Sequence, residues 1–560
     1  MNPDLQQLRA ALQRNPADFI AWLMLADLEM GAGAVQAGEA AVQRALQLRP
    51  GHPEGLARLG RARWLQSRFN ESVQLLQQAS ALLPQHPGIA LWLGHSLEDA
   101  GDAEAAANAY QRAHQLLPDE PYIAAQLLNL RRRLCDWRDL QPLSQQVRSA
   151  ISRGQPGVEP FAFLAEDASP AEQLACARLR AAGVAQSVRP LPPAPFRREP
   201  GPLRLGFLSN GFGAHPTGLL SVALFEALAR RHAQQLSLQL FALNPDDGSD
   251  IRQRLAAASQ LHDVSALDHL RIAQRIRSQR IDVLFDLRGW GGGGAPEVLA
   301  MRPAPLQVNW LAFPGSSGAP WIDRVLADDF SLPRELESGY SEQVLRLPRP
   351  FQPSDNQRQI PAAPSREACG LPAEGFVFCC FNNSYKLNPR SVQRMLAILA
   401  AVEGSVLWLL SGPGNANQRL AEAARAAGVD PQRLRFMPKL PQLDYLARYQ
   451  HADLFLDTSP YNAHTTASDA LWAGCPVLTT PGATFASRVA GSLNHQLGLD
   501  DMNVADDAAF IQRALQLAQQ PAHLQSVKTR LAQARQQPGG LFDMDAFADD
   551  FAQLFTASPA

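Results

Sequence analysis

The sequence lacks both a strong net charge and a long apolar run. Its 51 Lys and Arg residues nearly balance 53 Asp and Glu residues over 560 positions, which leaves a formal net charge of −2. Such a balance gives no overall basic field that would attract nucleic acid or an anionic membrane. No stretch approaches the roughly 18 apolar residues of a membrane span, and the first residues do not resemble a signal peptide. We therefore expect a cytoplasmic protein with neither nucleic acid nor membrane as a partner.

Metal-binding and redox patterns are also missing. The six cysteines form no CxxC pair and no His-linked metal spacing, so we expect small buried side chains in a reducing compartment. An Asp-x-Asp pair occurs at Asp543–Asp545, but it precedes a C-terminal helix, and Asp246-Asp247-Gly248 is typical of a turn. Gly211-Phe212-Gly213 lacks the third glycine of a dinucleotide fingerprint. The sequence thus predicts no metal site and no bound cofactor.

The N-terminal part repeats every 34 residues, as shown by Pro16, Pro50, Pro84 and Pro118. Three further sets keep this step: Leu25, Leu59 and Leu93; Ala26, Gly60 and Gly94; Ala45, Ala79 and Ala113. Small residues let paired helices approach closely, and proline ends the second helix of each pair. This pattern resembles the tetratricopeptide repeat. It predicts a helix at about 3–14 and helix pairs within 19–52, 53–86 and 87–120.

After the repeats, strand candidates begin to alternate with helices. Arg131–Arg133 continue the helical pattern and are typical of a solvated helix face, and proline-rich linkers are expected at 186–202 and at 348–364. The strands are expected at 203–209, 236–242, 281–287 and 306–311, then at 376–381, 406–410, 434–436, 454–457 and 476–479. The helices are expected near 217–232, 266–279, 389–401, 416–427, 507–517 and 544–556. This alternation favours parallel, doubly wound sheets.

The predicted fold class is an α-helical tetratricopeptide repeat domain followed by an α/β region of two Rossmann-like lobes, an arrangement called GT-B. The expected parts are repeats at 1–130, a helical connector and linker at 131–202, a first lobe at 203–365 and a second lobe at 366–560. Two such lobes leave a cleft between facing strand ends, where ligands bind in α/β folds.

The most informative stretch of the second lobe runs from Asn462 to Gly474, between two strand candidates. A helix starting at Thr465 and Thr466 offers free backbone N–H groups and a positive dipole end to an anion. Asp469, one turn later, is placed to accept sugar hydroxyls. Alternatively, the two threonines only cap the helix. Lys386 directly follows another strand, where it is placed to neutralise a diphosphate.

In the first lobe, His215-Pro216-Thr217 stands between the first strand and the first helix. We expect His215 to point into the cleft, where an ordinary pKa near 6.5 would let it donate a hydrogen bond or move a proton. A purely structural histidine is the alternative. The run Gly291–Gly294 follows another strand and either lets a ligand approach the backbone closely or forms only a flexible loop.

Several sequence motifs resemble, in the same order along the chain, those of the O-linked N-acetylglucosamine transferase family: 213–217, 302–311, 314–318, Tyr385-Lys386 and 464–474. Members of that family join tetratricopeptide repeats to a GT-B catalytic region. The resemblance covers almost the whole chain. It implies an inverting, metal-independent transfer of GlcNAc from UDP-GlcNAc to Ser or Thr hydroxyls of a protein or peptide acceptor presented by the repeats.

The resemblance also implies residue roles. His215 and Lys386 are the catalytic candidates, with Lys386 on the diphosphate, and Pro216 and Thr217 belong to the same motif as His215. The remaining matches are to the donor: Asn383 beside the diphosphate, His464, Thr465 and Thr466 at the phosphate-binding helix start, Asp469 on the ribose, Leu440 and Arg448 at the uracil, and Tyr445 stacked on it. A tyrosine in place of the family's histidine keeps an aromatic face.

Some positions depart from the family pattern. Gly211 stands where active protein-glycosylating members have an acid, and Phe161 aligns with a histidine, so His215 or the donor's own phosphate is left to take the acceptor proton. Tyr461 replaces a small residue beside the sugar's acyl group. Inner repeat positions such as Met24, Arg58 and Trp92 lack the family's asparagines.

These departures keep other functions open. The same fold serves with GDP-fucose or UDP-glucose as donor, and a repeat-based adaptor that binds a nucleotide without turnover is a further alternative. Pairing of two copies into a homodimer is left open as well.

Overall fold

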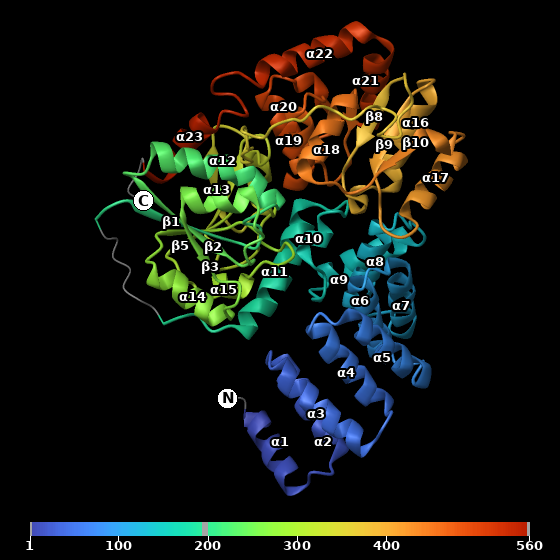
Figure 1. The fold of residues 1–560 in the computed structure, drawn as a ribbon, viewed down its shortest axis with the longest axis vertical. Helices are drawn as coiled ribbons and strands as arrows, with labels where there is room; N and C mark the ends of the chain where they lie inside the picture. Colours follow the sequence, from blue (N-terminus) through green and yellow to red (C-terminus); the bar gives the residue numbers. More distant parts are fainter. Residues whose placement is uncertain (1–2, 193–199, 557–560) are drawn as a thin grey trace. The chain divides into compact units, whose positions relative to one another are not determined.

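The structure of the protein is a computed structural model that describes residues 3–192 and 200–556 (Figure 1). The chain divides into two compact units: residues 1–146 with Gly412–Ala416, and Val147–Ser411 with Asn417–Ala560. Pro193 and Pro195 of the first expected linker lie outside the described residues, and 188–192 holds neither helix nor strand. Among the described residues, no helix is long and apolar enough to cross a membrane.

The predicted repeats are confirmed, because each predicted pair forms two helices. The helices of this region are α1 (Pro3–Arg14), α2 (Phe19–Gly31), α3 (Val35–Leu48), α4 (Pro53–Leu65), α5 (Phe69–Leu82), α6 (Pro87–Asp99), α7 (Ala103–Leu116) and α8 (Pro121–Arg133). Small residues stand where paired helices meet. A Cβ on Gly94 would lie 2.4 Å from the Tyr110 ring, and one on Gly60 would lie 2.8 Å from Leu76. The repeat spacing therefore reflects close helix contact.

The expectation for Arg131–Arg133 is wrong for two of the three arginines. Arg131 and Arg132 are 7% and 8% exposed. Arg131 donates to the Gln111 side chain and to the Arg138 carbonyl, both at 2.6 Å. The end of α8 is covered by the chain that follows it, so these guanidinium groups are packed rather than solvated.

The connector that follows is helical, with α9 (Leu140–Ser152), α10 (Pro160–Phe163) and α11 (Pro170–Ser187). Helix α11 begins with a capping box, in which Ser169 and Glu172 each accept a hydrogen bond from the other's backbone N–H. Five of the six cysteines are buried, as expected, whereas Cys369 is half-buried.

The first lobe is built on a parallel sheet with strand order β3-β2-β1-β4-β5-β6-β7. Its strands are β1 (Leu203–Ser209), β2 (Leu236–Ala242), β3 (Gln260–Asp263), β4 (Val283–Asp286), β5 (Leu306–Asn309), β6 (Arg324–Asp328) and β7 (Gln343–Leu347). Its helices are α12 (Pro216–Arg231), α13 (Asp250–Ala258), α14 (His269–Ser278) and α15 (Pro296–Ala300). Strands β3, β6 and β7 were not predicted; β3 and β7 are the edge strands of this sheet, and β3 is largely polar.

The second lobe repeats this architecture, with strand order β10-β9-β8-β11-β12. The strands are β8 (Val377–Cys380), β9 (Val406–Leu410), β10 (Leu434–Met437), β11 (Leu454–Leu456) and β12 (Val477–Leu478). The helices are α16 (Pro389–Ala401), α17 (Ala416–Ala426), α18 (Gln442–Arg448), α19 (Thr465–Trp472), α20 (Val489–Gln496), α21 (Asp507–Gln519) and α22 (Pro521–Ala534). The strands predicted for this lobe are all present, and the sheet is parallel throughout.

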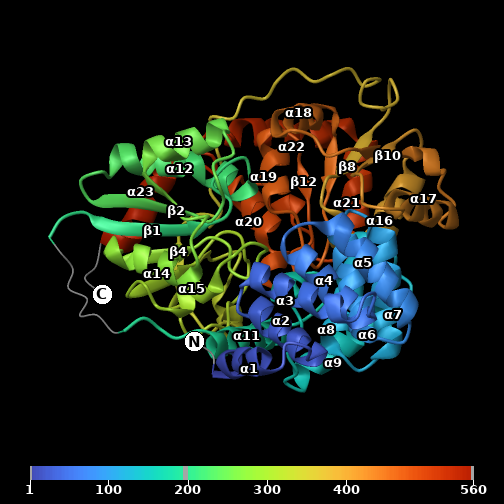
Figure 2. The ribbon, with the colours of Figure 1, turned by 60° about the horizontal axis from the view of Figure 1, so that its bottom comes forward.

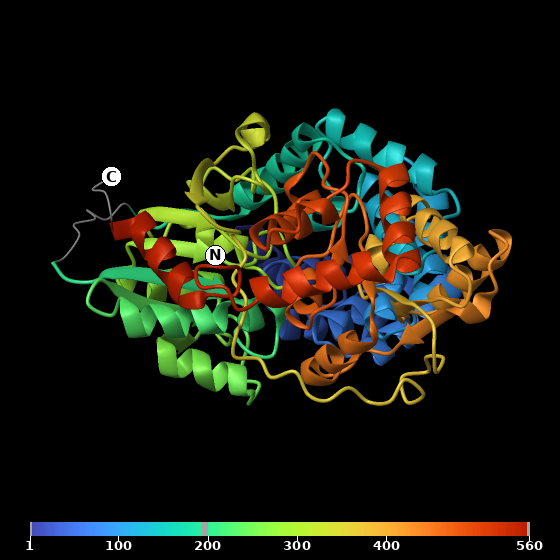
Figure 3. The ribbon, with the colours of Figure 1, turned by 90° about the horizontal axis from the view of Figure 1, so that it is seen from above.

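The last helix, α23 (Met544–Thr556), lies in the first lobe rather than in the second. Phe547 and Phe551 belong to the core that also holds β1, β4 and α12. Figures 1 and 2 show α23 beside α12, and Figure 3 shows the red C-terminal segment crossing back from the second lobe. The domain limits given above stay a prediction, but a second lobe that keeps 544–556 does not fit this packing.

The interlobe linker expected at 348–364 is confirmed as a stretch without helix or strand, and this fully described stretch continues to the start of β8 (Figure 2). Much of this linker is packed against the lobes. Phe351, Gln352, Ser354 and Asp355 are at most 3% exposed. Proline prevents regular structure here, while burial fixes the path of the chain.

Truncating a core residue of α23 tests its place in the first lobe. Phe551 is fully buried, and its ring centre lies 5.3 Å from that of Trp310 and 5.6 Å from that of Phe285. Phe551→Ala is expected to lower the free energy of unfolding by about 3–5 kcal/mol in urea denaturation. Gln553→Ala, at an exposed position of the same helix, should change it by no more than about 0.5 kcal/mol. Equal effects of the two substitutions would contradict the packing of α23.

Candidate active site

The candidate site lies where each sheet reverses its strand order. In the first lobe this point falls between β1 and β4, and in the second lobe between β8 and β11. Ligands of open α/β sheets bind at the carboxyl ends of strands at such points. The loop 210–215 and Arg288 follow the first pair of strands, and 382–386 and 457–464 follow the second. Each lobe therefore places its candidate motif residues at the position where ligands bind in this type of sheet.

Helix α19 begins at Thr465, and its N-cap residue is His464, whose side chain does not cap it. The threonines stand inside the helix, so the alternative that they serve as caps is wrong. Thr466 instead donates its hydroxyl to Asn382 Oδ1 at 2.7 Å. The first backbone N–H groups of a helix have no partner within it and carry its positive dipole end. This helix start is suited to hold an anion.

Asp457, at the end of β11, organises the loop before α19. Its fully buried carboxylate accepts hydrogen bonds from the backbone N–H groups of Thr458 and Ala463, at 2.8 and 2.7 Å. The same carboxylate accepts from Asn382 Nδ2 at 3.1 Å and from Thr479 Oγ1 at 2.7 Å. Burial raises the pKa of Asp457, while these donors and Lys386 oppose the rise. Asp457 therefore ties β8, β12 and the loop together around one negative charge.

Lys386 lies in the short 3-10 helix η2 (Ser384–Lys386) and is 9% exposed. Its Nζ donates to the Asn462 carbonyl at 2.8 Å and lies 3.9 Å from the centre of the Tyr461 ring. Burial lowers the pKa of Lys386 to about 8, although Asp457 and Cys380 favour the charged form. Lys386 thus contacts the loop that leads into α19.

Aromatic side chains surround this lysine. Tyr461 is 4% exposed, and its ring centre lies 4.9 Å from that of His464, 5.9 Å from Tyr385 and 6.3 Å from Phe161. His464 Nε2 donates to the Ala486 carbonyl at 3.0 Å, and burial together with Lys386 lowers the pKa of His464 well below its usual value. Phe161 and Tyr461, which both depart from the family pattern, therefore contact each other and form one aromatic wall.

Asp469 is 5% exposed and forms an ion pair with Arg358 of the interlobe stretch. Burial raises the pKa of Asp469, and Arg358 opposes this. The sequence offered no local signal for this partner, because Arg358 lies in a proline-rich passage far from α19. Asp457 could have been found, since it is a carboxylate at a strand end next to the motif.

The other residues predicted to bind the donor lie around α18 and η2. Tyr445 packs its ring against Phe381 and Tyr449, with ring centres 5.3 Å apart in both cases. Arg448 is half-buried and donates to the Asp444 carbonyl of its own helix at 2.8 Å. Leu440 is half-buried just before α18, and Asn383 is exposed while its neighbour Asn382 makes the contacts to Asp457 and Thr466. Their roles toward a nucleotide stay a prediction.

The first-lobe half of the site centres on His215, the half-buried N-cap residue of α12. His215 Nδ1 lies 3.2 Å from the Thr217 N–H, which donates to it. Arg288 Nη1, which can only donate, lies 3.4 Å from His215 Nε2, and a neutral ring accepts at one of its two nitrogens at a time. Burial and the Arg288 charge lower the pKa of His215 to about 4. Near neutrality, the His215 ring is therefore uncharged and only weakly basic.

The loop before His215 has no room for a side chain at position 211. A Cβ there would lie 2.5 Å from His215 Nδ1 and 2.9 Å from Thr217 Cβ. Asp247 holds the loop in place by accepting from the Ala214 N–H at 2.7 Å. Thr217 is 2% exposed, whereas Pro216 is exposed. An acid at position 211 is incompatible with this conformation of His215.

Both aspartates of the Asp-x-Asp pair make structural contacts. Asp543 accepts from the backbone N–H groups of Gly539 and Ala546, at 2.8 and 3.0 Å, and Asp545 pairs with Arg230. Over the described residues, no group of three or more His, Cys, Asp or Glu side chains is placed to hold a metal. Metal independence and the lack of a cofactor stay predictions.

The family model of glycosyl transferase family 41 matches residues 192–362 and 352–551. The chain belongs to glycosyltransferase family 41. This family 41 chain is 34% identical over 432 residues to the probable UDP-N-acetylglucosamine–peptide N-acetylglucosaminyltransferase SEC of Arabidopsis thaliana, over 73% of the chain and 44% of that protein. It is 24% identical over 550 residues to UDP-N-acetylglucosamine–peptide N-acetylglucosaminyltransferase of Caenorhabditis elegans, over 75% of the chain and 47% of that protein.

A solved structure of an O-GlcNAc transferase mutant from Thermobaculum terrenum superposes with a TM-score of 0.68 and 26% identity, over 99% of this family 41 chain and 98% of that one. The helical repeats followed by two parallel-sheet α/β lobes are thus a shared architecture. The chain spans less than half the length of the two curated relatives named above.

A methyl group at position 211 tests the fit of the first-lobe loop. Gly211→Ala is expected to displace His215 from the start of α12 and to lower the free energy of unfolding by about 1–3 kcal/mol in urea denaturation. Gly292→Ala is the matched control, because a Cβ there meets nothing within 4 Å. The prediction is wrong if both substitutions leave stability unchanged.

Proposed function

We propose that this family 41 chain is an inverting, metal-independent glycosyltransferase that moves GlcNAc from UDP-GlcNAc to Ser or Thr hydroxyls of proteins. The observation that carries the proposal is the contact of Lys386 with the loop that leads into α19, at the switch point of the second sheet. The names of both relatives given above describe transferases that use UDP-N-acetylglucosamine and a peptide, the first as probable. The donor supplies both the sugar and a charged leaving group that such a site is suited to hold.

The second-lobe half of the site is the place for the leaving group. In this proposal the Lys386 ammonium and the N–H groups at the start of α19 face the donor diphosphate. Charge that develops on the departing UDP is then met by donors that are already oriented, which is the main way in which such sites lower a barrier. Asp457 keeps the loop in shape and balances the lysine charge before the donor binds.

The reaction is a single displacement. The acceptor oxygen attacks the anomeric carbon from the side opposite the diphosphate, the bond from that carbon to the phosphate oxygen breaks, and UDP leaves. The acceptor proton passes to an oxygen of the donor phosphate. We assign it there because the lowered pKa makes His215 a weak base, and because Gly211 supplies no carboxylate.

His215 and Arg288 are then proposed to position the substrate. Arg288 Nη1 lies 3.4 Å from His215 Nε2, so the two side chains contact each other beside the start of α12. The neutral ring and the guanidinium position the sugar or the acceptor hydroxyl rather than removing its proton. His215→Gln, which keeps a polar side chain, is therefore a milder change than His215→Ala.

The repeats are proposed to present the acceptor protein. Several half-buried side chains of the repeats are charged or aromatic: Arg58 pairs with Asp27 at 2.9 Å, and the Arg61 guanidinium lies 4.8 Å from the centre of the Trp92 ring. Met24 is 52% exposed. Side chains of this kind would contact the side chains of an acceptor protein, rather than hydrogen-bond to its backbone as the family's asparagines do. The cytoplasmic location expected from the sequence stays a prediction, and pairing into a homodimer stays open.

Transfer of labelled sugar is the direct test. The protein is incubated with labelled UDP-GlcNAc and a cell lysate, with UDP-glucose and GDP-fucose as competing donors, and protein-bound label is counted. The wild type should label proteins, and Lys386→Met should lower the rate by at least about 100-fold, as loss of a charge-stabilising donor does. Equal labelling by the wild type and Lys386→Met would refute the assignment. Tight UDP binding without any transfer would favour the adaptor alternative instead.

The lowered pKa of Lys386 predicts how UDP affinity depends on pH. The lysine is charged below its pKa of about 8 and neutral above it. UDP binding to the free protein should therefore weaken as pH rises through 8, by up to about tenfold per pH unit, with uptake of a proton. The terminal phosphate is already ionised in this range. Calorimetry between about pH 7.5 and 9.5 in buffers of different ionisation enthalpy measures both quantities.

Lys386→Arg is the matched control for this pH dependence, because a guanidinium stays charged throughout the range. Its UDP affinity should lack the decline above pH 8, whatever its absolute value. A wild-type decline that persists unchanged in the arginine variant would assign the titration to another group.

A further inference from the structure

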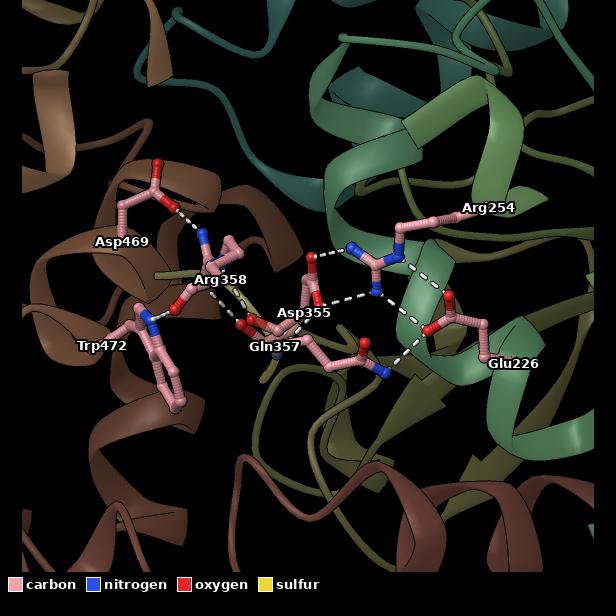
Figure 4. Close-up of polar contacts among 8 residues, drawn as sticks. Glu226, Arg254, Asp355, Gln357, Arg358, Asp469 and Trp472 are labelled. Carbon is pink, nitrogen blue, oxygen red and sulfur yellow. Dashed lines mark hydrogen bonds and ion pairs between the residues drawn. The ribbon is translucent and has the colours of Figure 1, made fainter. Parts of the chain in front are cut away.

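The short stretch 354–358 of the interlobe linker contacts both lobes (Figure 4). It leaves the first lobe after β7 and passes beside α19 before the second lobe begins. Figure 4 shows Asp355 and Gln357 reaching toward Arg254 and Glu226, and Arg358 reaching the other way toward Asp469. Adjacent residues of one segment therefore contact different lobes.

The contacts to the first lobe form an ion-pair network. Arg254 of α13 donates to both carboxylate oxygens of Glu226 of α12, at 2.8 Å each, and to Asp355 Oδ2 at 2.8 Å. Gln357 adds a hydrogen bond to Glu226 Oε2 at 2.8 Å. The Asp355 side chain is 1% exposed, so this network is a fixed attachment rather than a surface pair.

The contacts to the second lobe end on the donor half of the site. Arg358 Nη1 donates to Asp469 Oδ1, and its Nη2 and Nε donate to Ser354 Oγ at 2.9 Å and to the Asp355 carbonyl at 2.8 Å. Trp472 Nε1 donates to the Arg358 carbonyl at 3.2 Å. The Arg358 and Asp469 side chains are 3% and 8% exposed. Hydrogen bonds within the linker thus fix the orientation of the Arg358 guanidinium toward α19.

This ion pair leaves part of the carboxylate available. Oδ1 of Asp469 accepts from Arg358, and Oδ2 accepts no hydrogen bond from the residues that the structure describes. Figure 4 shows the second oxygen pointing away from the guanidinium. A carboxylate fixed at one oxygen and open at the other can accept from vicinal hydroxyls without first breaking the pair.

We propose that Arg358 is a positioning residue for ribose recognition: it fixes Asp469 in its ionised form, with Oδ2 presented to the hydroxyls of the donor ribose. The proposal rests on the proposed function, because it takes a nucleoside diphosphate as the ligand of this site. A buried carboxylate without a cation tends to protonate, and a protonated carboxyl is a weaker acceptor for hydroxyl donors. Removing Arg358 therefore costs the ribose contact even though Arg358 itself does not touch the nucleotide.

A comparison of two nucleotides isolates this contact. The binding of UDP and of 2′,3′-dideoxy-UDP is measured by calorimetry for the wild type, Arg358→Met, Arg358→Lys and Arg254→Met. The wild type should bind UDP about tenfold or more tightly than the dideoxy analogue, as expected for charge-assisted hydrogen bonds. Arg358→Met should lose most of this preference through weaker UDP binding, while its affinity for the analogue stays within about twofold of the wild type.

The remaining variants separate positioning from general loosening. Arg358→Lys keeps a positive charge and should restore most of the preference for UDP. Arg254→Met breaks only the first-lobe attachment and should keep the full preference. If Arg358→Met fails to fold, Arg358→Gln provides the same comparison with a neutral side chain that can still bond Ser354.

Each contrary outcome has a distinct meaning. If Arg358→Met keeps the wild-type preference, or if Arg254→Met loses it equally, the positioning role of Arg358 is overturned and the proposed function is unaffected. If the wild type binds both nucleotides equally, ribose recognition by Asp469 is refuted and the inference with it. If the wild type binds neither nucleotide, the proposed function itself fails.

Discussion

The structure of the candidate site depends on two buried groups of opposite charge, the Lys386 ammonium and the Asp457 carboxylate. Neither charge is solvated, so each must be met by hydrogen bonds that the fold supplies. Asp457 receives them from Asn382 and Thr479, which follow β8 and β12, and from the loop before α19. Lys386 donates to that same loop. These hydrogen bonds fix the path of the loop before any ligand binds.

The two lobes are joined by segments that are far apart in sequence. The linker stretch 354–358 is bound to both, and α23 returns from the second lobe to complete the core of the first. Further links come from Arg488, which donates to the Phe330 carbonyl at 2.7 Å, and from Ser492, which donates to Asp328 at 3.0 Å. This arrangement couples the donor half of the site to the lobe that carries His215. Asp355 and Arg358 of the linker thus contact the first lobe and Asp469, respectively.

The departures from the family pattern are structurally consistent with one another. Phe161 and Tyr461 contact each other beside Lys386, and Gly211 is required by the packing of His215 against Thr217. Arg288 lies next to His215 and lowers its pKa further than burial alone does. The first-lobe half of the site therefore contains a cation and a weakly basic, neutral histidine. A mechanism in which the donor phosphate accepts the proton suits this set of groups.

Periodicity alone was enough to predict the repeats, the alternating lobes and the strand ends that carry Lys386 and the 462–469 loop, because these follow from local spacing of apolar and small residues. Strands β3, β6 and β7, the return of α23, the packing of Arg131 and the partner of Asp469 were decided only by tertiary structure. Each depends on which distant surface covers a residue, and no local pattern encodes that. The sequence by itself thus determined where the candidate anion site is expected in the second lobe. The fold decided that Arg358 pairs with Asp469 and that burial beside Arg288 lowers the pKa of His215.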